Sequence, residues 1–162
     1  MELVECSVCI SSKTALTCDL CKQGSCKKCS HFIDKSEYEF LSLFDEELNG
    51  ETFCPNCYDE SIASQLENYN RILESAKDVN AYVGNSDLRA RAIRRIEKPV
   101  KIEDCVSKEE ALLKLGFLVA QKGFNTMVDV TLVSEKVGGI KRYKKLMWSG
   151  RATPVDPEIR KY

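Results

Sequence analysis

Apolar residues recur at helical spacing in three stretches of this chain of 162 residues. The first predicts a helix over about 36–49, because Ser36 and Glu39 form a capping box before it. The second predicts a helix over about 61–77, which lacks Gly and Pro and so reads as a stiff connector. The third predicts a largely buried helix over 107–121, again opened by a capping box and followed by a glycine. The apolar positions are Phe40, Leu41, Phe44 and Leu48, then Ile62, Leu66, Tyr69, Leu73 and Ala76, then Leu112, Leu113, Leu115, Phe117, Leu118 and Val119.

Strand-like patterns dominate the rest of the C-terminal half. A short strand is expected over 79–83, a strand with a basic outer face over 89–101, and an apolar strand over 126–133. Gly138-Gly139 would turn the chain, and a strand over 143–155 would return antiparallel to its predecessor. The separate helical and strand segments predict an α+β protein that ends in a small α/β domain with an antiparallel hairpin. In the returning strand, one face would hold Leu146, Trp148, Gly150 and Ala152.

Cysteine spacing supplies the strongest chemical signal. Eight of the nine cysteines form Cys-x2-Cys pairs, and each pair can supply half of a tetrahedral zinc site. The chain should therefore bind two Zn2+, and the spacing alone leaves open whether consecutive or alternate pairs share a site. A segment of about 58 residues buries little apolar surface, so metal binding should stabilise its fold. The predicted ligands are Cys6, Cys9, Cys18, Cys21, Cys26, Cys29, Cys54 and Cys57.

The segment Cys18–Ser30 and the closing Phe53-Cys54-Pro55-Asn56-Cys57 resemble a FYVE-type zinc finger. This resemblance implies a cross-braced finger in which the first and third pairs form one site and the second and fourth pairs form the other. FYVE domains bind phosphatidylinositol 3-phosphate through a basic run at the second pair, where this chain has Ala15-Leu16-Thr17-Cys18-Asp19. Binding to membrane lipid is therefore not expected. A RING-like or more general treble-clef arrangement is the alternative, although a RING usually has fewer residues between its second and third pairs.

The last helix and hairpin resemble the YbjQ-like family, whose members are described as heavy-metal-binding proteins. The likeness covers 79–155 and rests on 123–130, which reads Gly-Phe-Asn-Thr-Met-Val-Asp-Val, and on Gly150-Arg151-Ala152. It implies a small α/β domain that assembles into rings. The expected domains are a two-zinc finger at 1–58, a helical connector at 59–78 and a YbjQ-like domain at 79–162.

Charge is unevenly distributed along the chain. Residues 1–58 carry ten acidic and five basic side chains, although the whole chain has a net charge of -1. This acidic part should repel nucleic acid, and the basic residues beyond it are expected to form a solvated face. The first residues do not resemble a signal peptide and no apolar run is long enough to span a membrane, so a cytoplasmic location with free thiols is expected. The basic residues are Arg89, Arg91, Arg94, Arg95, Lys98 and Lys101, then Lys136, Lys141, Arg142, Lys144, Lys145 and Arg151.

Catalytic residues are not evident in the pattern. His31 is the one histidine and should be a surface or packing residue, whereas Cys105 should be buried as a small apolar residue. We therefore expect a non-catalytic interaction or scaffold protein with an unknown protein partner. We also expect it to form a homo-oligomer through 79–155, where a single helix covers a small sheet with open edges. The alternatives are a heavy-metal binding or sensing protein and, further off, a RING-like ubiquitin ligase or a phosphoinositide-binding adaptor.

Overall fold

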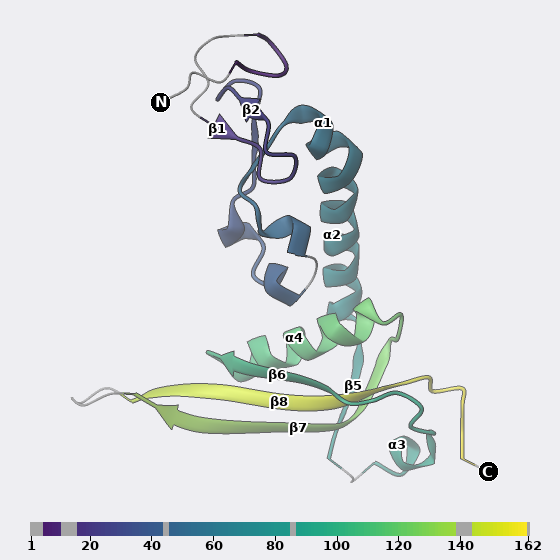
Figure 1. Ribbon diagram of the computed structural model, residues 1–162. Helices are drawn as coiled ribbons and strands as arrows, with labels where there is room; N and C mark the ends of the chain where they lie inside the picture. Colours follow the sequence, from purple (N-terminus) through teal and green to yellow (C-terminus); the bar gives the residue numbers. More distant parts are fainter. Residues whose placement is uncertain (1–4, 11–15, 44–45, 85–86, 139–143, 162) are drawn as a thin grey trace. The chain divides into compact units, whose positions relative to one another are not determined.

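The structure is a computed structural model of the whole chain, and it describes residues 5–10, 16–43, 46–84, 87–138 and 144–161. The chain divides into two compact units, Met1–Asn70 and Arg71–Tyr162. The division falls inside helix α2 (Ala63–Lys77), within the segment that the sequence assigns to the connector. Helices and strands are both abundant, which confirms the α+β class (Figure 1).

The N-terminal unit contains only short elements before its final helix. Strands β1 (Leu16–Thr17) and β2 (Gly24–Ser25) form one antiparallel pair, and β3 (His31–Phe32) and β4 (Thr52–Phe53) form another. Helix α1 (Pro55–Cys57) continues through a π-helical turn into α2, so the chain is helical from Pro55 to Lys77. The helix predicted over 61–77 is thus confirmed. The π-helical turn spans Tyr58–Ile62, and single 3-10 turns span Lys35–Glu37, Leu41–Leu43 and Glu46–Asn49.

The single helix predicted over 36–49 is wrong, because three 3-10 turns occupy this segment. The N–H of Ile33 donates to the carbonyl of Glu51 at 3.0 Å, so the segment must leave and return to one point. A straight helix of 14 residues would be about 21 Å long, so its short flanks would have to be almost fully extended to close this loop. The capping box also fails, since the carboxylate of Asp34 accepts from the N–H of Ser36 at 2.9 Å. The predicted apolar position at Phe44 lies outside the described residues.

Apolar side chains of the 3-10 segment and of α2 are buried in the N-terminal unit. Phe40, Leu48, Ile62 and Tyr69 are almost completely inaccessible to solvent. The Tyr69 hydroxyl accepts a hydrogen bond from the Phe40 N–H at 3.1 Å, and its ring meets that of Tyr38 edge-on with centroids 5.4 Å apart. The start of α2 is therefore part of the N-terminal core.

The C-terminal unit is a four-stranded sheet in the order β5-β7-β8-β6. Strand β5 (Asn80–Val83) runs parallel to β7 (Thr126–Val137). Strand β8 (Lys145–Val155) is antiparallel to both β7 and β6 (Val100–Cys105). Helix α4 (Lys108–Gln121) covers one face, and the short α3 (Leu88–Ala92) lies near one end of the other (Figure 1). The strands predicted over 79–83, 126–133 and 143–155 are confirmed, although β7 continues to Val137; Gly139 and Tyr143 lie outside the described residues.

The two faces of this sheet differ in their cores. The face under α4 holds the larger cluster, in which Leu115 and Val119 of the helix pack with Ile102, Val130 and Ala152 of the strands. The opposite face has a small cluster at one end, made by Ala90, Ile93, Val128 and Val155. The rest of this second face is left without a covering helix in the described part of the unit.

Helix α4 begins as predicted. The Ser107 hydroxyl accepts from the N–H of Glu110 at 3.0 Å, and the carboxylate of Glu110 accepts from the N–H of Val106 at 2.7 Å. Gly116 lets the helix approach the end of α2 closely, because a Cβ there would lie 2.8 Å from the carbonyl oxygen of Ala76. The buried helix expected over 107–121 is confirmed.

The strand predicted over 89–101 is largely wrong. Asp87 caps helix α3 by accepting from the N–H of Arg89 at 2.8 Å, and β6 starts only at Val100. The guanidinium of Arg95 donates to the carbonyls of Ala90 at 2.9 Å and Ile93 at 2.7 Å, which ties this side chain to the end of α3. Local capping and this side chain therefore override the apolar alternation.

Two aspartates in left-handed backbone conformation interrupt the sheet. Asp129 has φ 54° where the β7–β8 register shifts between Val128 and Thr131, and Asp104 has φ 57° where β6 shifts against β8. Such conformations place an extra residue in one strand and form a β-bulge. The register of β5 against β7 ends at Val130, so the outer edge of β7 beyond it has no paired strand among the described residues.

Candidate metal centre

The eight paired cysteines converge into two groups of four. In each group the Sγ atoms all lie within 4.8 Å of one another. The measured separations are 3.6 Å between Cys9 and Cys26 and 3.8 Å between Cys21 and Cys54. Four thiolates bound to one Zn2+ at about 2.3 Å would be about 3.8 Å apart, so both donor set and spacing fit this ion. The first group is Cys6, Cys9, Cys26 and Cys29, and the second is Cys18, Cys21, Cys54 and Cys57.

The grouping is interleaved, and two backbone hydrogen bonds explain it. The N–H of Ser7 donates to the carbonyl of Gly24 at 3.0 Å, which brings the first knuckle beside β2 and so beside the third pair. The N–H of Asp19 donates to the carbonyl of Thr52 at 2.8 Å, which brings the second knuckle beside β4 and the fourth pair. Of the two arrangements that the spacing allows, the structure therefore has the alternate one.

Backbone groups around the knuckles favour the thiolate form that a metal requires. Hydrogen bonds from the backbone at Cys9 and Val8 lower the pKa of Cys6 to about 6. Burial opposes the ionisation of Cys18, but the backbone at Cys54 and Cys21 outweighs it and lowers this pKa to about 6.

Other thiols have a raised pKa, namely Cys29 in the first group and Cys54 and Cys57 in the second. Hydrogen bonding to Cys26 raises the pKa of Cys29 to about 12, and burial raises that of Cys57. Without a cation, neighbouring sulfurs would thus share protons. A divalent ion would displace those protons, as expected for metal binding by grouped thiols.

Asp19 is a positioning residue that sequence reasoning missed. Its carboxylate accepts from the N–H groups of Glu51 at 2.7 Å and Thr52 at 2.9 Å, and these bonds lower its pKa, with Thr52 the larger cause. Gly50 permits this contact, because a Cβ there would lie 2.6 Å from the Asp19 Cβ and 2.7 Å from Cζ of Phe53. An acidic residue inside a knuckle, with a glycine before the last pair, was the available signal.

The remaining candidate residues lie outside both groups. His31 is exposed, and its ring stacks on that of Tyr58 with centroids 4.2 Å apart and planes 9° from parallel. Cys105 is fully buried under α4, where burial raises its pKa and its thiol donates to the carbonyl of Glu103 at 3.6 Å. The predictions of a surface or packing histidine and a buried cysteine are confirmed.

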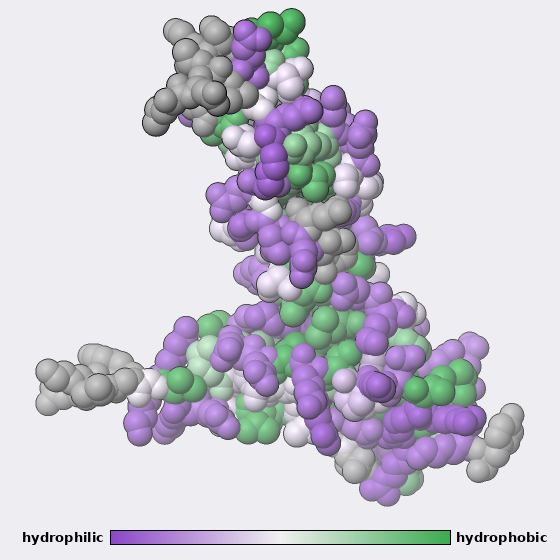
Figure 2. All heavy atoms as spheres, viewed as in Figure 1, coloured by the Kyte–Doolittle hydropathy of each residue, from purple (hydrophilic) through white to green (hydrophobic). Residues whose placement is uncertain are grey.

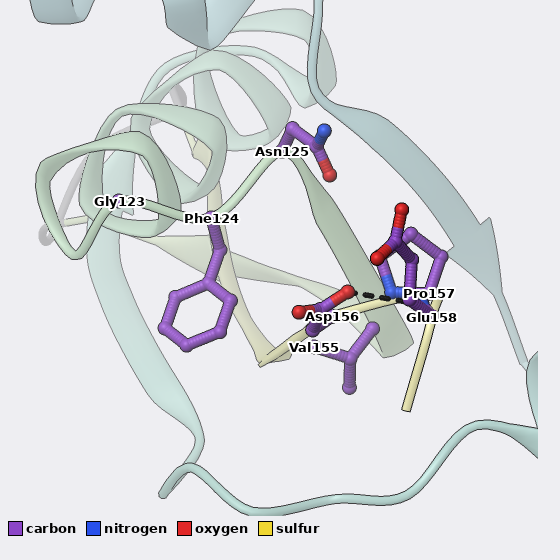
Figure 3. Close-up of a pocket in the computed structure, with 7 residues that line it drawn as sticks. All are labelled: Gly123, Phe124, Asn125, Val155, Asp156, Pro157 and Glu158. Atoms are coloured by element: carbon purple, nitrogen blue, oxygen red, sulfur yellow. Dashed lines mark hydrogen bonds between the residues drawn. The ribbon is translucent and has the colours of Figure 1, made fainter. Parts of the chain in front are cut away.

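A hollow in the C-terminal unit lies between the end of α4 and the chain after β8 (Figure 3). Phe124 and Val155 form the apolar part of this hollow. On its polar side, the carboxylate of Asp156 accepts a hydrogen bond from the N–H of Glu158 at 2.9 Å. The side-chain donors that line it are oxygen and amide groups, which suit hard cations better than soft heavy metals. This hollow therefore adds no argument for a heavy-metal site.

Family models, curated proteins and solved structures give no match to this chain. The FYVE-like and YbjQ-like resemblances thus stay predictions. Within the described segments, no helix is both long and apolar enough to cross a bilayer. Structure and site together define a chain with two four-cysteine groups that could hold two metal ions, and with a separate unit built on a mixed sheet.

Proposed function

We propose that this chain is a non-catalytic zinc-binding interaction protein, in which a two-zinc module is displayed by a self-associating α/β domain. The observation that carries the proposal is the pair of four-sulfur groups at the spacing of a tetrahedral ion. Four protein ligands complete the coordination of Zn2+ and leave no open position for a substrate. The metal would therefore be structural, and the surface around it would do the binding.

Zinc is favoured over other metals by the ligands and their separation. Thiolate ligands select zinc, Cu(I) or iron, and four of them in a closed tetrahedral site are typical of zinc. A cluster of several iron atoms would hold its four cysteine sulfurs farther apart than the 4.8 Å limit observed here. A single ion in each group is the better fit.

Exposed apolar side chains support a role in protein binding. Val8 and Ile10 are 45% and 76% exposed beside the first knuckle, and Phe32 of β3 is 54% exposed. Much of the surface seen in Figure 2 is hydrophilic. Exposed apolar groups on a metal-stabilised frame suit contact with a protein partner.

Open sheet edges support self-association of the C-terminal domain. Beyond Val130, β7 has no outer partner strand among the described residues, and Val133 and Val137 are about half exposed there. Unpaired edges invite pairing with another copy, and several copies would display several zinc modules at once. Repetition would raise the avidity for a multivalent partner without any new contact.

Two measurements on the full chain test this proposal. Elemental analysis should find two zinc ions per chain, and light scattering at tens of micromolar should give a mass above that of one chain. Val133→Lys should lower this mass, because it places a charge on the open edge, whereas Ile96→Lys, at a 53% exposed residue away from that edge, should leave it unchanged. A monomeric wild-type protein would remove self-association from the proposal, and one ion per chain would remove the two-zinc module.

A further inference from the structure

The sheet brings together two basic segments that are far apart in the sequence. Lys101 of β6 and Arg151 of β8 are direct partners in the antiparallel register, so their side chains lie on one face. Val100, Ile102 and Ala152, their neighbours along the strands, point into the core under α4. Lys101 and Arg151 therefore lie on the opposite face, which α4 does not cover.

A hollow of about 370 Å³ lies on that face around Arg151. Strand β7 contributes Asp129 and Thr131, and β8 contributes Arg151 and Thr153. The bulge at Asp129 shifts the register here, and Gly84 and Pro99 complete the rim. Two strands thus position polar groups around one opening, and the ends of β5 and β6 lie at its rim.

The one carboxylate in this hollow is already neutralised. Both oxygens of Asp129 accept from Arg95, from Nε at 3.0 Å and from Nη2 at 2.8 Å. These bonds chiefly, together with the charges of Lys161 and Arg151, hold the pKa of Asp129 below its usual range. With Asp129 and Arg95 balanced, Arg151 and Lys101 leave the hollow positively charged.

Two polar groups in the hollow lack a protein partner. Within the described segments, neither the guanidinium of Arg151 nor the hydroxyl of Thr153 has a hydrogen bond or ion pair, and Thr153 is only 5% exposed. A hydroxyl at the wall of the hollow can donate its proton, and the guanidinium beside it offers a fork of donors. An oxygen-rich anion would satisfy both.

We propose that this hollow binds a tetrahedral oxyanion, namely a phosphate or sulfate group. Arg151 supplies a bidentate, charge-assisted contact, Thr153 donates its hydroxyl proton, and Lys101, the cross-strand partner of Arg151, adds positive charge on the same face. The group can come from inorganic phosphate or from a small phosphate monoester. This site is independent of the zinc module and of self-association.

The test is calorimetric titration of the full chain with sodium phosphate, sodium sulfate and a nucleoside monophosphate at constant ionic strength. Saturable binding of one anion per chain is expected, and it should weaken at least tenfold in Arg151→Gln, since contacts to a charged group are lost. Arg151→Lys should be intermediate, and Thr153→Val, which keeps the shape, should lose several-fold. Tighter binding of the monophosphate would assign the ester as the source, and equal binding would assign inorganic phosphate.

Lys108→Gln is the matched control, because it removes the same charge at the start of α4 on the other side of the sheet. Its affinity should equal that of the wild type, and thermal unfolding should show that every variant is folded. The proposal is overturned if phosphate and sulfate do not bind saturably. It is equally overturned if Arg151→Gln binds like the wild type, or if Lys108→Gln loses as much affinity as Arg151→Gln.

Discussion

The two units of this chain reach a folded state by different means. Every strand that the structure describes in the N-terminal unit has two residues, and two groups of four cysteines join segments that are far apart in its sequence. The C-terminal unit has strands of 12 and 11 residues that pack on a helix of 14. We therefore expect bound metal to stabilise the first unit together with its small apolar core, whereas apolar burial stabilises the second.

Metal removal should produce the largest difference in stability between the two units. Structural zinc contributes about 10–16 kcal/mol in zinc-finger peptides, so a chelator at neutral pH should unfold the N-terminal unit. The C-terminal unit should stay folded, because its cluster around Leu115 contains none of the eight cysteines. Hydrogen exchange measures the loss of amide protection in β1–β4. The fluorescence of Trp148, the only tryptophan, reports whether the C-terminal unit is folded. A shift of Trp148 emission at the same chelator concentration would show that the units are not independent.

Replacing one cysteine in each unit sharpens the contrast. Cys26→Ser should lose the ion of the first group and the protection of β1 and β2, since a closed site needs all four ligands. Cys105→Ser should keep two ions per chain, because this thiol is buried in the apolar cluster under α4. Elemental analysis and hydrogen exchange on both variants provide the measurement. Loss of metal in Cys105→Ser would assign that residue to a site that the structure does not show.

Truncation of a core side chain in the C-terminal unit should destabilise that unit and leave the metal sites intact. Leu115 is fully buried, so Leu115→Ala should destabilise this unit by about 2–5 kcal/mol. Metal content should remain at two ions per chain, and denaturant unfolding followed by Trp148 fluorescence measures the change. Leu88→Ala, at a residue 76% exposed, is the control and should change stability little. An equal loss of stability in both variants would argue against the apolar cluster as the source of stability.

The sequence was sufficient to predict features that depend on residues close together in the chain. Cys-x2-Cys pairs fix the kind of site, and the Ser107 cap with its apolar run fixes α4, because each depends on neighbours in the chain. The pairing of the knuckles was not determined by spacing. It depends on contacts such as Ser7 with Gly24, which join residues far apart in sequence.

The wrong predictions share one cause. The 36–49 segment has helical spacing, but its ends are tied together between Ile33 and Glu51, and a long helix would need almost fully extended flanks to close this loop. The bulges at Asp129 and Asp104 and the pairing of Arg95 with Asp129 are also tertiary effects that local propensity does not encode. Residues that link distant segments were therefore the ones that sequence reasoning missed.

The smallest expected effect concerns the ion pair of Asp129 and Arg95, and it is visible only through its pH dependence. Hydrogen bonds from Arg95 lower the pKa of Asp129 in the folded state below the value of about 3.9 of an unfolded aspartate. A carboxyl group whose pKa is lowered by folding stabilises the folded state at pH values above its unfolded pKa. This contribution disappears as the pH falls through its pKa in the folded state. Asp129→Asn isolates the effect, because asparagine also tolerates the left-handed conformation at φ 54°.

This variant should be less stable than the wild type by about 1–2 kcal/mol above pH 5, a modest value because both side chains are partly exposed. The difference should shrink towards zero as the pH falls below 4. Denaturant unfolding of the full chain, followed by Trp148 fluorescence, isolates the C-terminal unit, whose sheet carries the pair. Acid also protonates the thiolates and releases metal from the N-terminal unit, but that loss is common to both proteins and cancels in the difference. A difference that persists unchanged at pH 3 would mean that Asp129 stabilises the bulge through its backbone conformation or neutral hydrogen bonds, and that its charge contributes nothing.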